Sequence, residues 1–381
     1  MENFQGKLYV ALNNYLTEYK EKNDGNKYKP VAVGRYGIRT RESIYSKELA
    51  KDYSKNKVIF QNTLTVGMGS NQIDIGILDK DEIYSVSPAY HTYKISEINA
   101  NYLRYCLECR NQDMFIRYVK RGSRQGKTID LKRWLTYEIP VYDESTQQEI
   151  VSTLDKVSKI IENRKYQLDK LDELVKSRFI EMFGDPVCNP KGWEKVSLSD
   201  IAELKIGPFG SLLHKEDYCD YQHPVINPSH IIDGKIIVDN NLTVTNDKYE
   251  ELYAYHLKIG DVILGRRGEM GRCAVVESDN MLCGTGSLFI RPFGELRADF
   301  IQKIISFPTF KKTIEDMAVG QTMPNLNVPI VSNFQIIKPP IEVQASYYDF
   351  VAQVDKSKLA VQKSLEQLEI LKKALMQEYF G

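Results

Sequence analysis

The stretch Gln167-Leu-Asp-Lys-Leu-Asp-Glu-Leu-Val-Lys-Ser-Arg-Phe-Ile-Glu-Met-Phe-Gly184 recurs at the end of the chain as Ser364-Leu-Glu-Gln-Leu-Glu-Ile-Leu-Lys-Lys-Ala-Leu-Met-Gln-Glu-Tyr-Phe-Gly381. Three leucines and the final Phe-Gly match. Just upstream, Leu154–Lys156 matches Val354–Lys356 in a register that differs by three residues, which predicts that one helix is shorter by about one turn. A repeat of such long period indicates two copies of one structural unit.

Both copies end a proline-free stretch in which apolar residues recur at heptad spacing. This pattern is typical of helices that pair in a coiled coil, although a core helix of one globular domain stays an alternative. The seam, the row of residues through which the paired helices would meet, is imperfect. Arg164 and Arg178 stand at seam positions where apolar residues are expected. The residues expected to pair the helices and dock a partner are Leu154, Ile161, Leu168, Leu171, Val175, Val354, Val361, Leu368, Leu371 and Leu375.

The two halves also match outside the helices. Leu64–Gly69 parallels Ile263–Gly268, and Ile98–Leu103 parallels Leu296–Ile301. An Asp-Gly turn between apolar runs, at 231–238, predicts a β-hairpin. We therefore expect an α+β fold: two mixed α/β domains in tandem, each followed by a long helix, with the helices paired as an antiparallel coiled coil. The expected boundaries are 1–143 and 185–340 for the domains and 144–184 and 341–381 for the helices.

The composition of the 381-residue chain is balanced, with 51 basic and 51 acidic residues and a formal net charge of zero. This balance excludes a protein that coats DNA through charge alone, but it allows local basic surfaces. No apolar run approaches the roughly 20 residues that span a bilayer, and the N-terminal residues lack a signal pattern, so we expect a cytoplasmic protein. Six scattered cysteines argue against a disulfide framework. Cys106 and Cys109 have no second cysteine pair to complete a zinc site.

Motifs for catalysis are weak. Ser87-Pro-Ala-Tyr90 resembles the motif with which amino-methyltransferases hold an adenine, but alanine replaces its second proline, and a structural turn is the better interpretation. The glycines around 67–69 and 265–271 do not have nucleotide-binding spacing and are interpreted as tight turns. The five histidines form no ligand spacing. The sequence therefore predicts no catalytic residue and no metal site.

Residues suited to DNA recognition are better represented. Gly34–Arg41 holds three arginines, and Ile116–Arg133 holds seven basic residues and one acidic residue around Gly122–Gly126. Arginine reads guanine bidentately, glutamine reads adenine, and glycine lets the backbone approach phosphates. Solvated loop charges are the alternative for each single residue. The candidate DNA-binding residues are Arg35, Tyr36, Arg39, Arg41, Arg121, Ser123, Arg124, Gln125, Lys127, Arg266, Arg267, Gln321 and Thr322.

Four segments resemble the DNA-specificity (S) subunits of type I restriction–modification systems. They are Gln147–Lys156 continuing to Ser177–Pro186, Gly192–Ile201, Lys258–Gly271, and Phe350–Lys358 with the helix that follows. The resemblance covers essentially the whole chain and is most specific in the helices. The first domain departs from the family pattern, because it lacks the Gly-Trp-Glu opening that the second has at Gly192-Trp-Glu194.

The resemblance implies a non-catalytic subunit in which each mixed domain is a target recognition domain for half of a bipartite site in double-stranded DNA. The helices would set the spacer and dock two methyltransferase (M) subunits, with motor-nuclease (R) subunits joining for restriction. S-adenosylmethionine, ATP and Mg²⁺ would then bind to the partners, and no membrane would be involved. A helix of 38 residues is about 57 Å long, roughly 17 base pairs of DNA. A coiled-coil scaffold without sequence reading and a free-standing DNA-modifying enzyme remain alternatives.

Overall fold

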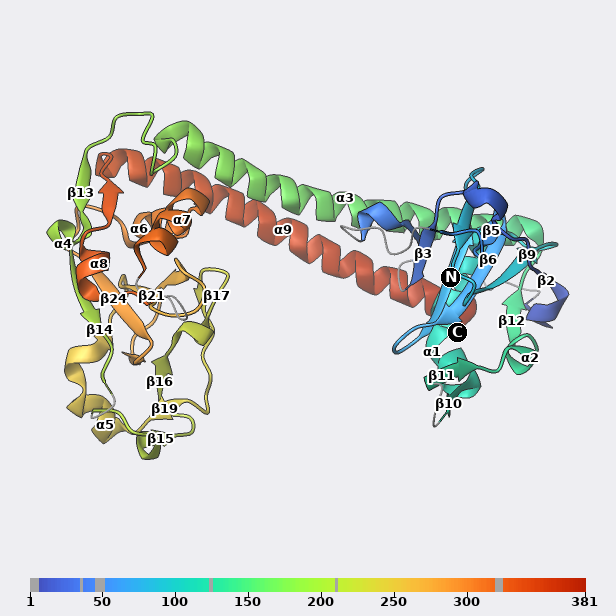
Figure 1. Ribbon diagram of the computed structural model, residues 1–381, viewed down its shortest axis with the longest axis horizontal. Coiled ribbons are helices and arrows are strands. Elements are labelled where there is room, and N and C mark those ends of the chain that lie inside the picture. Colours follow the sequence, from blue (N-terminus) through green and yellow to red (C-terminus); the bar gives the residue numbers. More distant parts are fainter. Residues whose placement is uncertain (1–6, 35–36, 45–51, 123–125, 210–211, 319–324) are drawn as a thin grey trace. The chain divides into compact units, whose positions relative to one another are not determined.

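The computed structural model describes residues 7–34, 37–44, 52–122, 126–209, 212–318 and 325–381. The chain divides into two compact units, one formed by Met1–Leu168 with Ala360–Gly381 and the other by Asp169–Leu359. Each unit contains a mixed domain and part of each of two long helices, α3 (Glu144–Phe183) and α9 (Ile341–Phe380). Both helices are labelled in Figure 1.

The first unit is built on the antiparallel four-stranded sheet β2-β9-β6-β7. Leu64 and Val66 of β6 point to one face, where they pack with helix α1. The other face is covered by a smaller apolar cluster that includes Val31 and Val33. The elements are β1 (Leu8–Ala11), β2 (Leu16–Tyr19), β3 (Val31–Gly34), β4 (Gly37–Thr40), β5 (Lys57–Ile59), β6 (Thr63–Met68), β7 (Ile73–Leu78), β8 (Tyr84–Val86), β9 (His91–Ile95), α1 (Ala100–Tyr118), β10 (Val119–Gly122), β11 (Gly126–Ile129), α2 (Leu131–Trp134) and β12 (Glu138–Val141).

The second unit repeats this plan with the sheet β14-β24-β21-β22 and adds the five-stranded sheet β15-β19-β16-β23-β20. The expected hairpin forms, with Ile231 opposite Ile236 and positive φ at Asp233 and Gly234. The elements are β13 (Lys195–Ser197), α4 (Leu198–Ile201), β14 (Ala202–Ile206), β15 (Tyr218–Cys219), β16 (His223–Ile226), β17 (Ile231–Ile232), β18 (Lys235–Ile236), β19 (Thr243–Val244), α5 (Asn246–Glu251), β20 (His256–Leu257), β21 (Val262–Gly265), β22 (Cys273–Val275), β23 (Met281–Cys283), β24 (Ser287–Pro292), α6 (Ala298–Ile305), α7 (Pro308–Met317), α8 (Val328–Ser332) and β25 (Gln335–Ile337).

The predicted parallels between the halves are confirmed. Leu64–Gly69 and Ile263–Gly268 contain the ends of β6 and β21, which hold the same place in their sheets. Ile98–Leu103 and Leu296–Ile301 lead into α1 and α6. A short antiparallel pair, β1 with β12 or β13 with β25, brings the start of each domain beside its end. The tandem α+β fold expected from the sequence is therefore present.

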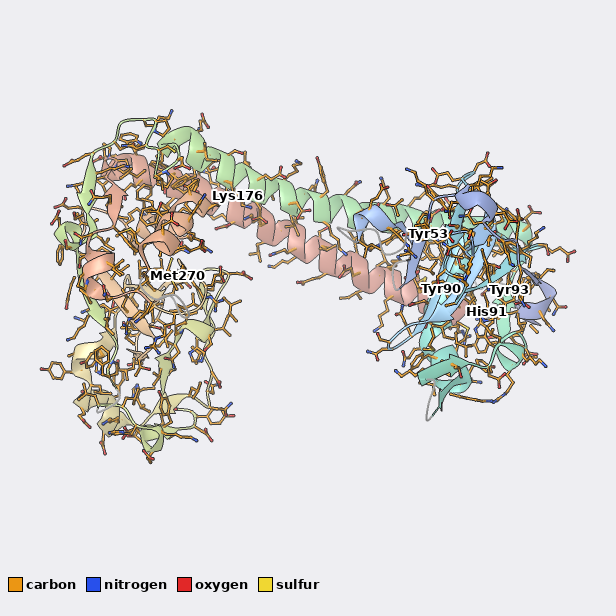
Figure 2. The ribbon with its side chains drawn as sticks, viewed as in Figure 1. Tyr53, Tyr90, His91, Tyr93, Lys176 and Met270 are labelled. Carbon is orange, nitrogen blue, oxygen red and sulfur yellow. The ribbon has the colours of Figure 1, made fainter. Side chains whose placement is uncertain are left out.

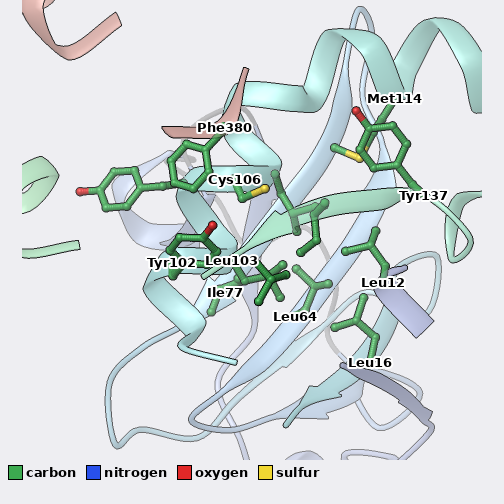
Figure 3. Packing of buried hydrophobic residues seen from close by; sticks show 14 of the residues in the cluster. Leu12, Leu16, Leu64, Ile77, Tyr102, Leu103, Cys106, Met114, Tyr137 and Phe380 are labelled. Carbon is green, nitrogen blue, oxygen red and sulfur yellow. The ribbon is translucent and has the colours of Figure 1, made fainter. Parts of the chain in front are cut away.

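The ends of the long helices belong to the cores of the two units. Phe380 packs against Tyr102 in the first unit, with 5.2 Å between ring centroids, and Figure 3 shows it in the core with Leu103 and Cys106. Phe183 packs against Phe300 in the second unit at 4.8 Å. Burial raises the pKa of the Cys106 thiol, as expected for a core cysteine.

The expected difference in helix length was wrong. Both helices have 40 residues, and Phe183 and Phe380 end them in equivalent packing positions. The match between Leu154–Lys156 and Val354–Lys356 is therefore a coincidence of sequence. The residues of α9 that are structurally equivalent to Leu154–Lys156 lie about one turn before Val354–Lys356.

Each long helix has a face of buried or half-buried residues at alternating steps of three and four. On α3 these are Leu154, Val157, Ile161, Arg164, Leu168, Leu171, Val175, Arg178 and Met182; on α9 they are Tyr347, Val351, Val354, Lys358, Val361, Leu365, Leu368, Lys372, Leu375 and Tyr379. Leu371 lies off this face with 46% of its surface exposed, so its assignment to helix pairing was wrong; Lys372 occupies the seam position instead.

Contacts inside each unit are those of antiparallel helices. In the first unit Leu154 shares a core cluster with Met376, and Lys165 pairs with Glu369 at 3.1 Å. In the second unit Lys358 pairs with Asp172 at 2.5 Å, and the Tyr347 hydroxyl donates to the Val175 carbonyl at 3.4 Å. These contacts agree with the expected pairing within each unit, and one coiled coil along the full length stays a prediction. Among the described residues, no helix is long and apolar enough to cross a membrane.

Candidate nucleic-acid interface

The first basic cluster of the first unit lies on β4 and the short 3-10 helix that follows it (Arg41–Ser43). Arg39 is exposed on β4, whose backbone pairs with Ala32 of β3. Arg41 is half-buried, and its guanidinium lies 5.1 Å from the centre of the Tyr53 ring, labelled in Figure 2. A guanidinium over a ring face is held by cation–π attraction, which fixes its direction. Arg39 is the more accessible of the two cations.

The second basic cluster begins at the end of helix α1 and continues through the β10–β11 hairpin. Arg117 pairs with Asp113 at 2.7 Å, and Lys120 pairs with Asp130 at 2.7 Å. The hydrogen bond from Lys120 lowers the pKa of the Asp130 carboxyl. These pairs offset part of the positive charge that the sequence count suggests, so fewer cations remain to meet a phosphate backbone.

Lys127, on β11, reaches across to another loop. Its ammonium donates to the Ser70 carbonyl oxygen, in the turn between β6 and β7, and lies 5.4 Å from the centre of the Phe115 ring. The side chain is half-buried. The structure therefore places this predicted DNA-binding residue where it joins two segments of its own domain.

The two predicted arginines of the second unit, Arg266 and Arg267, have opposite environments. Arg266 is only 6% exposed, and its Nε donates to the Leu326 carbonyl oxygen at 2.7 Å. Burial lowers the pKa of its guanidinium. Arg267 is exposed, and its backbone forms a β-bridge with Asn325. The interior position of Arg266 does not support the expected direct DNA contact, whereas Arg267 is accessible.

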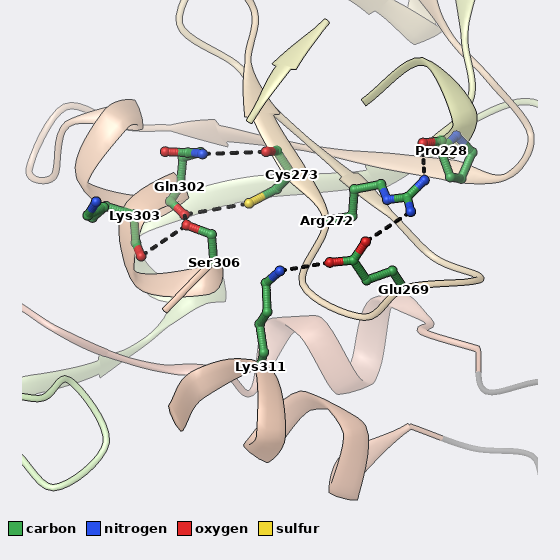
Figure 4. Close-up of polar contacts among 8 residues, drawn as sticks. All are labelled: Pro228, Glu269, Arg272, Cys273, Gln302, Lys303, Ser306 and Lys311. Atoms are coloured by element: carbon green, nitrogen blue, oxygen red, sulfur yellow. Dashed lines mark hydrogen bonds and ion pairs between the residues drawn. The ribbon is translucent and has the colours of Figure 1, made fainter. Parts of the chain in front are cut away.

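Further along the same turn, Glu269 links two cations. Its carboxylate accepts from Arg272 at 2.9 Å and from Lys311 of α7 at 3.0 Å (Figure 4). The hydrogen bond from Lys311 is the main cause that lowers the pKa of this carboxyl. Gly271 has φ +74°, and a Cβ there would lie 2.7 Å from the Lys311 side chain. The turn and α7 are therefore tied closely together.

The remaining candidates cannot be placed in this interface. Arg121 lies on β10, where only its backbone is described. The other candidates lie outside the described residues: Arg35, Tyr36, Ser123, Arg124, Gln125, Gln321 and Thr322. Their contact with DNA stays a prediction.

The motif at Ser87–Tyr90 has a structural role. The Tyr90 hydroxyl donates to the Val33 carbonyl oxygen at 2.8 Å, and a Cβ at Gly67 would lie 2.3 Å from the Tyr90 ring. The ring therefore lies directly on the backbone of β6, which requires glycine there. The described residues contain no cluster of three or more His, Cys, Asp or Glu side chains that could hold a metal ion.

Sequence reasoning missed two kinds of exposed apolar residue. Phe209 is 59% exposed, and the Arg266 guanidinium lies 6.0 Å from its ring. Leu174 of α3 is 46% exposed, the same fraction as Leu371 of α9. Leu371 follows Leu368 by three residues and precedes Leu375 by four, so heptad spacing alone does not separate it from the seam, and only its exposure in the structure does.

Comparisons with known proteins agree with this architecture. Residues 9–172 and 190–370 match the family model for the type I restriction modification DNA specificity domain. The specificity subunit of type I restriction enzyme MjaVIII from Methanocaldococcus jannaschii is 22% identical over 356 residues, covering 88% of this chain and 82% of that protein.

Two solved structures share the fold. One, from work on complex assembly and conformational transition of the type I R-M system, is 16% identical with a TM-score of 0.64 and covers 98% of this chain and 97% of its own. The other, an S subunit of a type I restriction-modification system from M. genitalium, is 16% identical with a TM-score of 0.55 and covers 100% of this chain and 98% of its own.

Proposed function

This chain belongs to the type I restriction modification DNA specificity family, and we propose that its two domains each read one half of a bipartite site in double-stranded DNA. It is a specificity subunit with two tandem recognition domains. The observation that carries the proposal is the repeated sheet, β2-β9-β6-β7 in one unit and β14-β24-β21-β22 in the other. Two copies of one reader match a target with two separately read halves.

The exposed arginines support DNA contact at one place in each domain. Arg39 and Arg267 are both exposed, on β4 and in the turn after β21. A guanidinium fits both a phosphate and the guanine edge, so these residues contribute either affinity or base discrimination.

We assign the unread spacer between the half-sites to the long helices. Each has 40 residues, which corresponds to about 60 Å at 1.5 Å per residue and roughly 18 base pairs of DNA. Because the length of an α-helix is set by its residue count, the spacer is a property of these helices and the half-site sequences are a property of the domains.

The partners in this proposal are two methyltransferase (M) subunits, joined for restriction by motor-nuclease (R) subunits. Leu174 and Leu371 match in the sequence repeat and are equally exposed, which fits two equivalent docking points for two copies of one partner. This chain is then the non-catalytic subunit, and the complex carries adenine methyltransferase and ATP-dependent endonuclease activity. S-adenosylmethionine, ATP and Mg²⁺ belong to the partner subunits.

The test compares the purified chain, alone and assembled with its methyltransferase subunit, on DNA whose methylated positions have been mapped in the host genome. We expect specific binding to a bipartite site and methyl transfer only in the assembly. Exchanging residues 1–143 for another recognition domain should change one half-site and leave the other.

Methyl transfer by the chain alone would show a free-standing enzyme instead. Binding that ignores the sequence and weakens uniformly with salt would show a scaffold without sequence reading.

A further inference from the structure

In each unit one cation joins a hairpin turn to the segment that precedes a short helix. The turn is that between β6 and β7 or between β21 and β22, and the short helix is α2 or α8. In the first unit, Lys127 from that segment donates to the Ser70 carbonyl oxygen of the turn. In the second unit the direction is reversed, because Arg266 in the turn donates to the Leu326 carbonyl oxygen at 2.7 Å. Both cations were candidate DNA contacts, and both are used inside the domain.

Arg266 makes the more extensive connection. Its Nη1 also approaches the Thr285 carbonyl oxygen at 3.5 Å, and its guanidinium lies 6.0 Å from the Phe209 ring. The backbone reinforces the link, because the Leu326 amide donates to the Arg266 carbonyl oxygen at 3.0 Å. The side chain therefore touches three segments that are distant in sequence.

The approach of the Phe209 loop to this site is tight. Gly207 packs so closely that a Cβ there would lie 2.0 Å from the Gly284 carbonyl oxygen. No side chain fits at that position, so the loop that carries Phe209 is held against the strand end beside Thr285. Arg266 fills the space between these segments, while its neighbour Arg267 is exposed.

We propose that Arg266 is a positioning residue of the second recognition domain: it fixes the turn at 265–268 against residues 325–326, so that Arg267 is presented to DNA. Lys127 does the same for the turn beside Ser70 in the first domain. This inference rests on the proposed function, because it assigns roles within the DNA-reading surface.

Arg266 and Arg267 have different roles because their guanidinium donors have different acceptors. A buried arginine whose donors are given to backbone carbonyls has lost its water, and removing it from these acceptors would leave them unpaired. An exposed arginine keeps its donors available for phosphate oxygens or a guanine edge. Two adjacent arginines thus have different tasks because one side chain points inward.

The experiment uses the full chain assembled with its methyltransferase subunit and a duplex carrying the mapped site. Binding is measured over a series of KCl concentrations for the wild type, R266Q, R266K and R267Q. We expect R267Q to reduce the slope of log K against log salt by about one if Arg267 meets a phosphate, or to relax one base position if it meets a base. If Arg267 meets a base, R266Q should keep the wild-type salt slope and lose about tenfold in discrimination at the second half-site only; if Arg267 meets a phosphate, R266Q should lower the salt slope as R267Q does.

Two further measurements separate positioning from folding. R266K, which keeps a charged donor, should recover part of the lost discrimination. Hydrogen exchange at the Leu326 amide should accelerate in R266Q and stay slow in R267Q, since that amide donates to the Arg266 carbonyl. K127Q should relax the first half-site and leave the second unchanged.

Three results would overturn the inference. They are a salt slope that falls for R266Q and not for R267Q, wild-type binding and discrimination by R266Q, or an equal loss of binding at both half-sites accompanied by a loss of folded protein. Failure of the proposed function looks different, because the wild-type assembly itself would then show no dependence on the DNA sequence.

Discussion

Gln147 and Gln344 make the same two hydrogen bonds in the two units. The side-chain oxygen of Gln147 accepts from the Asn99 amide at 3.0 Å, and its amide donates to the Tyr142 carbonyl at 2.8 Å. Gln344 accepts from the Arg297 amide at 3.0 Å and donates to the Pro339 carbonyl at 2.9 Å. Each glutamine thus joins the first turn of a long helix to its domain.

Replacing Gln344 by alanine should destabilise the second unit. The side chain is fully buried, so the change leaves the Arg297 amide and the Pro339 carbonyl without their partner. We expect a loss of about 2–4 kcal/mol in the free energy of unfolding, measured by urea titration. Gln362→Ala, at an exposed position of the same helix, is the matched control and should change stability by less than about 0.5 kcal/mol. Equal losses of stability in the two variants would contradict a stabilising role for the two hydrogen bonds of Gln344.

Charge at Leu174 or Leu371 should weaken partner docking without unfolding the chain. Both side chains are 46% exposed, so a glutamate at either position can keep its carboxylate in water. Each should weaken binding of one methyltransferase subunit by about tenfold, as loss of an apolar anchor at an interface does. Native mass spectrometry then shows a single bound partner for each variant.

The matched control for these two variants is Leu359→Glu, on the same helix as Leu371 and also exposed but with a glutamate, Glu162, at the equivalent place of the repeat. It should retain two partners. If Leu174→Glu and Leu371→Glu both retained two methyltransferase subunits, these leucines would not be the docking points.

The cap of helix α3 should make stability depend on pH in the acidic range. The Asp143 carboxylate accepts from the Ser145 hydroxyl at 2.5 Å and from the Thr146 amide at 3.0 Å, and these bonds lower its pKa from 3.8 to about 2. Because the folded state holds the carboxylate ionised, the stabilisation is present above pH 3.8 and is lost as the pH falls toward 2.

Asp143→Ala should therefore lower the urea midpoint at pH 7, and the difference from the wild type should shrink as the pH approaches 2. The difference shrinks because protonation at low pH removes the stabilising ionised cap from the wild type, and the alanine variant lacks that cap at every pH. If the difference in urea midpoint between the wild type and Asp143→Ala stayed constant from pH 7 to pH 2, ionisation of the Asp143 carboxyl would not be the cause of the pH-dependent stability.

Shortening both helices by one heptad should change the spacer and preserve both half-sites. Removing 161–167 from α3 and 365–371 from α9 keeps the alternating steps of three and four on each seam, and it takes out both members of the Lys165–Glu369 pair. Seven residues correspond to about 10 Å, or roughly three base pairs. Mapping methylated positions should reveal the same half-sites with a shorter spacer.

The matched control removes 161–167 alone, which shifts one seam against the other and should reduce folded protein instead of giving a new spacer. A changed half-site sequence in the double deletion would contradict the assignment of spacing to the helices.

The sequence by itself determined the tandem fold. The repeat that ends in Gly184 and Gly381, the heptad leucines and the Asp-Gly hairpin are local patterns, because helix and turn formation depend on neighbouring residues. The family resemblance also followed from local segments, such as Gln147–Lys156 and Gly192–Ile201. The register of the repeat was misjudged upstream, where three matching residues around Asp155 and Asp355 outweighed the equal length of the helices.

Only the tertiary structure decided which polar side chains face inward. Arg266 and Arg267 are the same residue type side by side, and the difference between them depends on Leu326, which is distant in the sequence. Gln147 and Gln344 carry no apolar signal, and the seam position of Lys372 in place of Leu371 depends on which helix face meets the partner segment. Burial of a polar group is favourable only where the fold supplies its acceptors, and those acceptors come from segments that the local sequence does not specify.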